Sequence, residues 1–127
     1  MANNTITFNP DSNVAFGVNL TILEGADFKS TFKVNKENKS AFDLTGYAIH
    51  GKMKKSVAIG ASTGGIQGFT AGITSAAGGE FNISLTDTIT KDLKPGRYYY
   101  DINVVSSAST VYKMVSGNIV VEGGLSV

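Results

Sequence analysis

His50 is the only histidine in this chain of 127 residues, and it is therefore the only candidate for an imidazole base. Nucleophilic catalysis needs a nucleophile, a base within reach and a third group that orients the base. His50 falls on the outward side of an alternating segment, between Ala48 and Lys52, and no Gly-x-Ser-x-Gly motif is present. We therefore interpret His50 as a surface residue.

Carboxylates are the second set of candidates, because paired Asp or Glu residues hydrolyse glycosidic bonds. Asp87 and Asp92 are close in sequence, and Asp101 lies in a later strand-like segment. We expect Asp87 to cap a turn or helix, Asp92 to be solvated, and Asp101 to pair with Lys113 on the next strand. These interpretations leave no general acid, and the sequence predicts a protein that is not an enzyme.

Metal and phosphate sites have little support from the residue types. The chain has no cysteine and a single histidine, which makes a transition-metal site improbable. Asn9, Asp11 and Asn13 offer alternating oxygen ligands for calcium, but no acidic residue follows at EF-hand spacing. The glycine-rich segment 60–65 lacks the Lys-Ser/Thr and the helix that follow a phosphate-binding loop. We expect no cofactor, no metal and no small-molecule substrate.

The charge balance excludes broad electrostatic attraction. Eleven basic and ten acidic residues give a net charge of +1, so nucleic acid and membrane surfaces are not expected partners. No apolar run approaches the roughly 18 residues of a membrane span, and the start of the chain does not resemble a signal peptide. A modest basic patch is interpreted as a solvated face; it comprises Lys29, Lys33, Lys52, Lys54 and Lys55.

Period-two alternation of apolar and polar residues dominates the chain and indicates β-strands. It is clearest in Phe28–Val34, Tyr47–Lys54, Phe81–Leu85 and Tyr98–Val104. Turn signals recur every eight to twelve residues. The sequence predicts an all-β, antiparallel, immunoglobulin-like sandwich of about 7–8 strands, with at most one helical turn near 87–93. A small β-barrel is the alternative.

The alternation also predicts which side chains face the core. We expect the following to be buried: Phe28, Phe32, Ile49, Met53, Phe81, Ile83, Leu85, Tyr98, Tyr100 and Ile102. Residues 13–23 are predicted to form one strand. Ser116-Gly117 is predicted to form a β-bulge in the last strand, because a bulge lets the inward register change.

The expected organisation is an N-terminal arm or edge strand over 1–13, a sandwich domain over 14–121 and a tail over 122–127. The arm and tail bury little alone and would dock on neighbouring subunits. Exposed tyrosines are suitable interface anchors. The candidate interface residues are Ile6, Phe8, Tyr99, Tyr112 and Leu125.

Three segments resemble, in order and spacing, those of small β-sandwich proteins of tailed bacteriophages. They are Asn19–Phe28 with its Glu-Gly-Ala-Asp-Phe ending, Asp43–Tyr47 followed by the strand end Met53–Ser56, and Gly79–Leu85 followed by Pro95–Asp101. The resemblance covers roughly Leu20 to Val121. It is to the N-terminal domains of phage upper-baseplate proteins and to stand-alone virion proteins.

This resemblance implies a bacteriophage virion structural protein, a non-enzymatic assembly module of the tail, baseplate or capsid decoration. Its partners would be other virion proteins and copies of itself, and it would reside in the virion after synthesis in the host cytoplasm. The alternative is a carbohydrate- or receptor-binding sandwich, for which Tyr47, Tyr99 and Tyr112 are the candidate exposed aromatics. The absence of tryptophan weakens that alternative.

Overall fold

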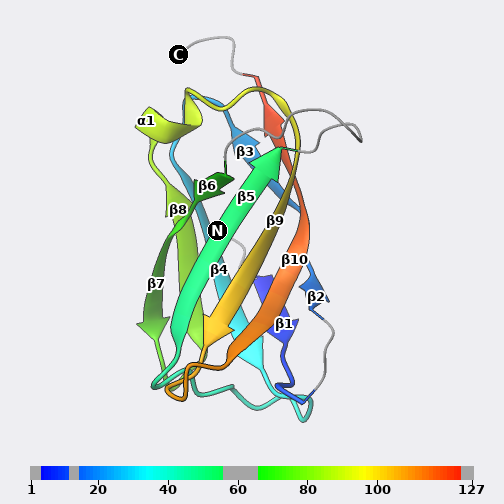
Figure 1. The fold of residues 1–127 in the computed structure, drawn as a ribbon, viewed down its shortest axis with the longest axis vertical. Coiled ribbons are helices and arrows are strands. Elements are labelled where there is room, and N and C mark those ends of the chain that lie inside the picture. Colours follow the sequence, from blue (N-terminus) through cyan, green and yellow to red (C-terminus); the bar gives the residue numbers. More distant parts are fainter. Residues whose placement is uncertain (1–3, 12–14, 56–65, 124–127) are drawn as a thin grey trace.

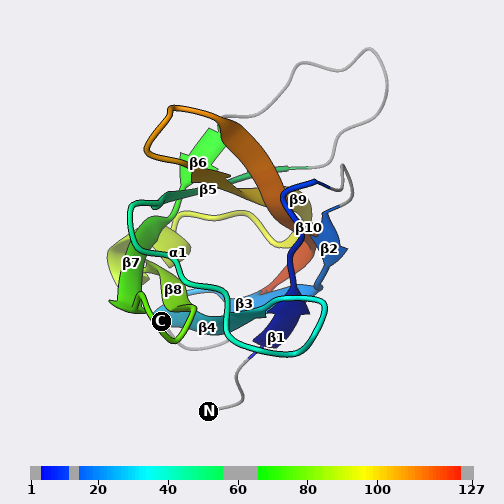
Figure 2. The same cartoon turned by 90° about the horizontal axis from the view of Figure 1, so that it is seen from below.

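The computed structural model describes residues 4–11, 15–55 and 66–123. Within them the chain forms two β-sheets and one helical turn (Figure 1). Figure 2 shows the sheets as two facing layers, and the cluster of buried apolar side chains forms the core. The prediction of an all-β sandwich is confirmed, and so is the single helical turn.

The smaller sheet has four strands in the order β1-β4-β8-β7. These strands are Asn4–Thr7, Phe28–Asn35, Glu80–Leu85 and Thr70–Ser75. The larger sheet has six, in the order β2-β10-β9-β5-β6, with β3 also paired to β10. They are Phe16–Gly17, Val111–Glu122, Gly96–Val105, Ala48–Lys55, Ile66–Gly68 and, for β3, Leu20–Leu23.

The strand orders β4-β8-β7 and β10-β9-β5 correspond to the B-E-D and G-F-C orders of the immunoglobulin fold. Three pairings are parallel, namely β1 with β4, β2 with β10 and β3 with β10. The sheets are therefore mixed rather than purely antiparallel. The cause is the N-terminal segment, which adds one edge strand to the small sheet and then runs along β10 in the large one, with no hairpin to either partner.

The core is built from the inward positions that the alternation predicts. Nine of the ten predicted residues are buried, and Ile49 is partly buried against the same cluster. Phe32 on β4 and Phe81 on β8 are opposite each other in register, and their rings stack with centroids 5.1 Å apart. Both side chains are fully buried, so this stacked pair lies at the centre of the small sheet's inner face.

The predicted strand over 13–23 is broken into β2 and β3 at Val18 and Asn19. The Val18 amide donates to the Ser116 carbonyl at 3.0 Å, and the Tyr100 hydroxyl donates to the Val18 carbonyl at 2.6 Å. Burial raises the pKa of Tyr100 well above its usual range, so its hydroxyl stays protonated and able to donate. Gly117 permits this close approach, because a Cβ atom there would overlap the Val18 carbonyl. These contacts hold the interrupted strand against β10.

The bulge in β10 lies between Lys113 and Val115, not at Ser116-Gly117 as predicted. Its consequence is that Met114 and Val115, adjacent in sequence, are both buried. Gly117 serves the contact with Val18 instead. A glycine in a strand marks either a bulge or a close backbone approach, and the sequence alone does not separate the two.

The connection between β8 and β9 contains the helical turn α1, Asp87–Thr90, with Thr86 at its N-cap position. It leads into β9, where the Tyr98 hydroxyl donates to the carbonyl of Lys94 at 2.9 Å. A tyrosine near the start of strand F that bonds a few residues upstream is the tyrosine corner of immunoglobulin-like sandwiches. Lys55 completes this corner, since its amine donates to the Pro95 carbonyl at 3.2 Å and lies 5.9 Å from the Tyr98 ring centroid.

Replacing Tyr98 by Phe is expected to lower the free energy of unfolding by about 1 kcal/mol, because the Lys94 carbonyl loses its donor. Tyr98 is buried, so water replaces that bond poorly. Tyr99→Phe is the matched control, since the Tyr99 side chain is half exposed. Urea unfolding of the two variants measures the difference; equal stabilities would show that the corner contributes nothing.

Candidate interaction surface

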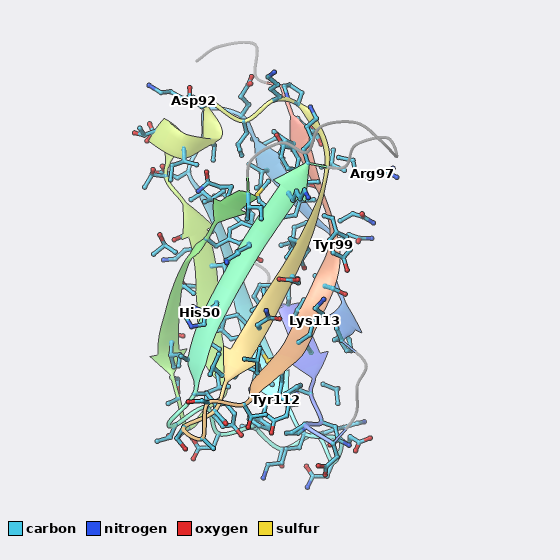
Figure 3. The ribbon with its side chains drawn as sticks, viewed as in Figure 1. His50, Asp92, Arg97, Tyr99, Tyr112 and Lys113 are labelled. Carbon is cyan, nitrogen blue, oxygen red and sulfur yellow. The ribbon has the colours of Figure 1, made fainter. Side chains whose placement is uncertain are left out.

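The outward face of the large sheet gathers the basic side chains of three strands. Alternation places Lys52 and Lys54 of β5, Arg97 of β9 and Lys113 of β10 on this side, since their neighbours in sequence point to the core. Figure 3 shows Arg97, Tyr99 and Lys113 along these strands. These four cations together with Tyr99 are called the basic face below.

Two carboxylates share this side of the sheet. Asp101 lies 3.5 Å from Lys113, which confirms the predicted ion pair, and it is also opposite Lys52 in register. Glu122 is at the far end, as the last residue of β10. Four cations and two carboxylates leave two positive charges here. The whole chain carries +1, so the rest of the molecule is negative by one charge.

Exposed apolar side chains concentrate on the same side. Seven large apolar residues are exposed among those the structure describes, and alternation and register place five of them on the outward face of the large sheet. These five are Leu23, Ile66, Tyr99, Val111 and Val120. Tyr99 is 50% exposed and Ile66 is 63% exposed. The outward face of the small sheet has none of the seven.

Tyr99 and Ile66 flank a shallow depression on this face. Lys54 is paired with Ile66 on one side and with Tyr99 on the other, so the three side chains form one row across the sheet. The depression has a volume of about 210 Å³. It is lined by Lys52, Met53, Lys54, Ile66, Tyr99, Tyr100 and Asp101.

The structure buries some of the predicted interface residues and exposes others. Ile6 is 0% exposed and Phe8 is 4% exposed, so both belong to the chain's own core and the expectation that they dock on a neighbour is corrected. The reason is that β1 pairs with β4 and directs Ile6 inward. Tyr112 is half-buried, with its ring 6.0 Å from that of Phe8. Tyr99 is exposed, and Leu125 lies outside the described residues.

The lysines of the predicted basic patch do not lie on one surface. Lys29 and Lys33 are on the outward face of β4, in the other sheet, and Lys55 contacts the Tyr98 corner. Sequence reasoning missed the contribution of Arg97 and Lys113. Alternation could have predicted both positions. Arg97 is two residues from the outward Tyr99 in β9, so it lies on the same face, and Lys113 was already expected to pair with an outward Asp101.

The catalytic candidates do not converge. His50 is exposed on the outward side of β5 (Figure 3). The Asp87 amide donates a hydrogen bond of 2.8 Å to the Asp27 carboxylate, and Asp101 on β9 is paired with Lys113. The pKa of Asp43 lies below its usual range because the side chain and then the amide of Thr45 hydrogen-bond to its carboxylate. A carboxylate of lowered pKa is a poor general acid.

The candidate calcium ligands are partly engaged by protein groups. The Asn9 carboxamide oxygen accepts from the Asp11 amide at 2.9 Å, which forms an Asx turn, and Asn13 lies outside the described residues. Within residues 4–11, 15–55 and 66–123, no three His, Asp or Glu side chains cluster as a metal site. The segment 60–65 also lies outside the described ranges. No helix in those ranges has the length and apolar character needed to cross a membrane.

Comparison with known proteins defines the class of fold. No protein-family model matches the sequence, and no curated protein matches it. Among solved structures, the N-terminal domain of phage TP901-1 ORF48 is similar, with a TM-score of 0.51 and 11% identity. That match covers 96% of this chain and 99% of the phage domain. The chain is therefore an all-β sandwich that shares the fold of this domain.

A second solved structure is a family 123 glycoside hydrolase from Clostridium perfringens, described for glycolipid glycan hydrolysis. It has a TM-score of 0.40 and 14% identity, over 86% of this chain and 23% of that one. A likeness this distant supports no statement about activity.

Proposed function

We propose that this chain is a structural protein of a bacteriophage virion, a non-enzymatic module that binds other virion proteins and copies of itself. The observation that carries the proposal is the end-to-end match to a phage domain of almost the same extent. The resemblance of its sequence segments to those of upper-baseplate domains and stand-alone virion proteins points the same way.

The rigid sandwich suits this role. Near the N-terminus, β1 pairs with β4 in the small sheet and β3 pairs with β10 in the large sheet. The stacked Phe32–Phe81 pair fills the centre of the small sheet's inner face. Such a module presents a fixed surface, so little ordering entropy opposes assembly. The location in the particle would be the tail, the baseplate or the outside of the capsid.

Two measurements test the proposal. Mass spectrometry of purified virions is expected to detect this polypeptide, and cryo-electron microscopy of the same particles is expected to show density that fits the sandwich. Density on the capsid lattice would make it a decoration protein, and density at the tail or baseplate an attachment module. Its absence from virions would overturn the proposal.

A carbohydrate-binding module remains the alternative function, and it requires aromatic side chains exposed on one face. Of Tyr47, Tyr99 and Tyr112, only Tyr99 is exposed, at 50%; the other two side chains are partly buried. Tyr47 and Tyr112 pack against the core, and the Tyr47 ring lies 5.6 Å from that of Phe42. The structure thus offers one aromatic platform where this function usually needs several, and the virion role is the better supported of the two.

A further inference from the structure

We infer that the basic face is the docking surface of this protein, and that its partner is an acidic surface of another virion protein with an apolar side chain at its centre. The inference rests on the proposed virion role and names the surface and the chemistry of the partner.

The excess of positive charge on the basic face indicates that the partner surface is negatively charged. On β5, Lys54 is opposite Tyr99 and Lys52 is opposite Asp101, while Arg97 is two residues from Tyr99 on β9. The one carboxylate near the centre of the face, Asp101, already has Lys113 as a partner. Like-charge contacts across an interface cost free energy and opposite charges speed association, so this face favours an acidic partner.

The exposed apolar side chains indicate that the partner contributes an apolar contact as well as negative charge. Interfaces owe much of their binding energy to a few aromatic anchors that are covered on binding. Tyr99 is half exposed at the centre of the cations, and Ile66 lies across Lys54 from it. The depression of about 210 Å³ between them has room for one apolar side chain.

A protein fits this face better than a nucleic acid does. Strong binding to duplex DNA commonly uses about 6–10 phosphate contacts, whereas the basic face has four cations spread over three strands. A phosphate backbone would also leave Tyr99, Ile66 and the depression uncovered. An acidic protein surface satisfies both the charges and the apolar contact.

The test compares two double charge reversals in competition with the wild-type chain. One is Lys52→Glu with Lys54→Glu on the basic face. The matched control is Lys29→Glu with Lys33→Glu on the opposite sheet. Each pair reverses two charges on one strand, and each places one new carboxylate across from an acidic residue, since Lys52 is opposite Asp101 and Lys33 is opposite Glu80.

Cells producing the virus would supply the wild-type chain and one variant in equal amounts, and mass spectrometry of purified particles would give their ratio. We expect the basic-face variant to be under-represented at least about tenfold, since reversal turns attraction into repulsion, and the control to be incorporated like the wild type. Tyr99→Ala is expected to reduce incorporation as well. Thermal unfolding of each purified variant verifies that all of them fold.

The possible failures are distinguishable. Equal incorporation of both double variants, with the wild type present, would overturn the docking inference and leave the virion role intact. A wild-type chain that is absent from the particles would remove the virion role and the inference together. Binding of duplex DNA by the purified chain at about 0.15 M salt, lost in the Lys52→Glu and Lys54→Glu variant, would reassign the face to nucleic acid.

Discussion

Gly117→Ala is expected to lower the free energy of unfolding by about 3 kcal/mol and to loosen β2 and β3 from β10. The added methyl group would overlap the carbonyl oxygen of Val18. That oxygen is the acceptor for the buried Tyr100 hydroxyl, so the strand cannot move away without breaking the bond. Urea unfolding measures the loss, and hydrogen exchange of the β2 and β3 amides shows where the structure opens.

Gly17→Ala is the matched control for this prediction. Gly17 is also a strand glycine, it neighbours Val18, and a Cβ atom there would meet nothing within 4 Å. We expect its stability to stay within about 0.5 kcal/mol of the wild type, because alanine also restricts the unfolded chain. Equal effects of the two substitutions would mean that the contact at Val18 does not restrict position 117.

Phe32→Ala is expected to cost about 3–5 kcal/mol, the usual range for removing a buried ring. Phe32 is fully buried, and its ring stacks on Phe81 at an interplanar angle of 6°. The cavity would lie inside the small sheet's inner face, where backbone pairing on both sides limits collapse. Chemical denaturation followed by fluorescence of the tyrosines measures the change.

Phe16→Ala provides the comparison with the same change of side chain. Phe16 is 39% exposed on β2, so we expect it to cost no more than about 1 kcal/mol. Phe32→Leu keeps most of the volume and should recover much of the loss. A Phe32→Ala protein as stable as Phe16→Ala would contradict the central place assigned to the stacked pair.

Much of the fold could be predicted because alternation is a local signal. The inward rows of β4, β8 and β9 follow directly from period two, and the confirmed burial of Phe32, Phe81 and Tyr100 reflects this. What could not be predicted depends on contacts between distant segments. The burial of Ile6 follows from parallel pairing of β1 with β4, about 28 residues away in sequence, and no local pattern specifies that partner.

For the candidate surface too, local features could be predicted from the sequence and contacts between strands could not. Alternation predicted that Tyr99 points outward and that Asp101 pairs with Lys113, and both are observed. The grouping of Lys54 with Ile66 and Tyr99 required the register of three strands. Sequence position alone had instead joined Lys29 to the lysines of β5, although the two strands belong to different sheets.

The parallel pairing of β3 with β10 has a mechanical consequence. Because the two strands are parallel, the chain enters β3 at Leu20, opposite Ile119, and leaves β10 at Glu122, the other end of the paired stretch. A pull on the segment that enters β3 and on the end of β10 therefore slides these two strands past each other, across the direction of their hydrogen bonds. Bonds loaded in shear share the force and must break together, whereas an antiparallel pair pulled from its open end unzips one bond at a time. The attachment of β3 makes this sandwich suited to bearing tension.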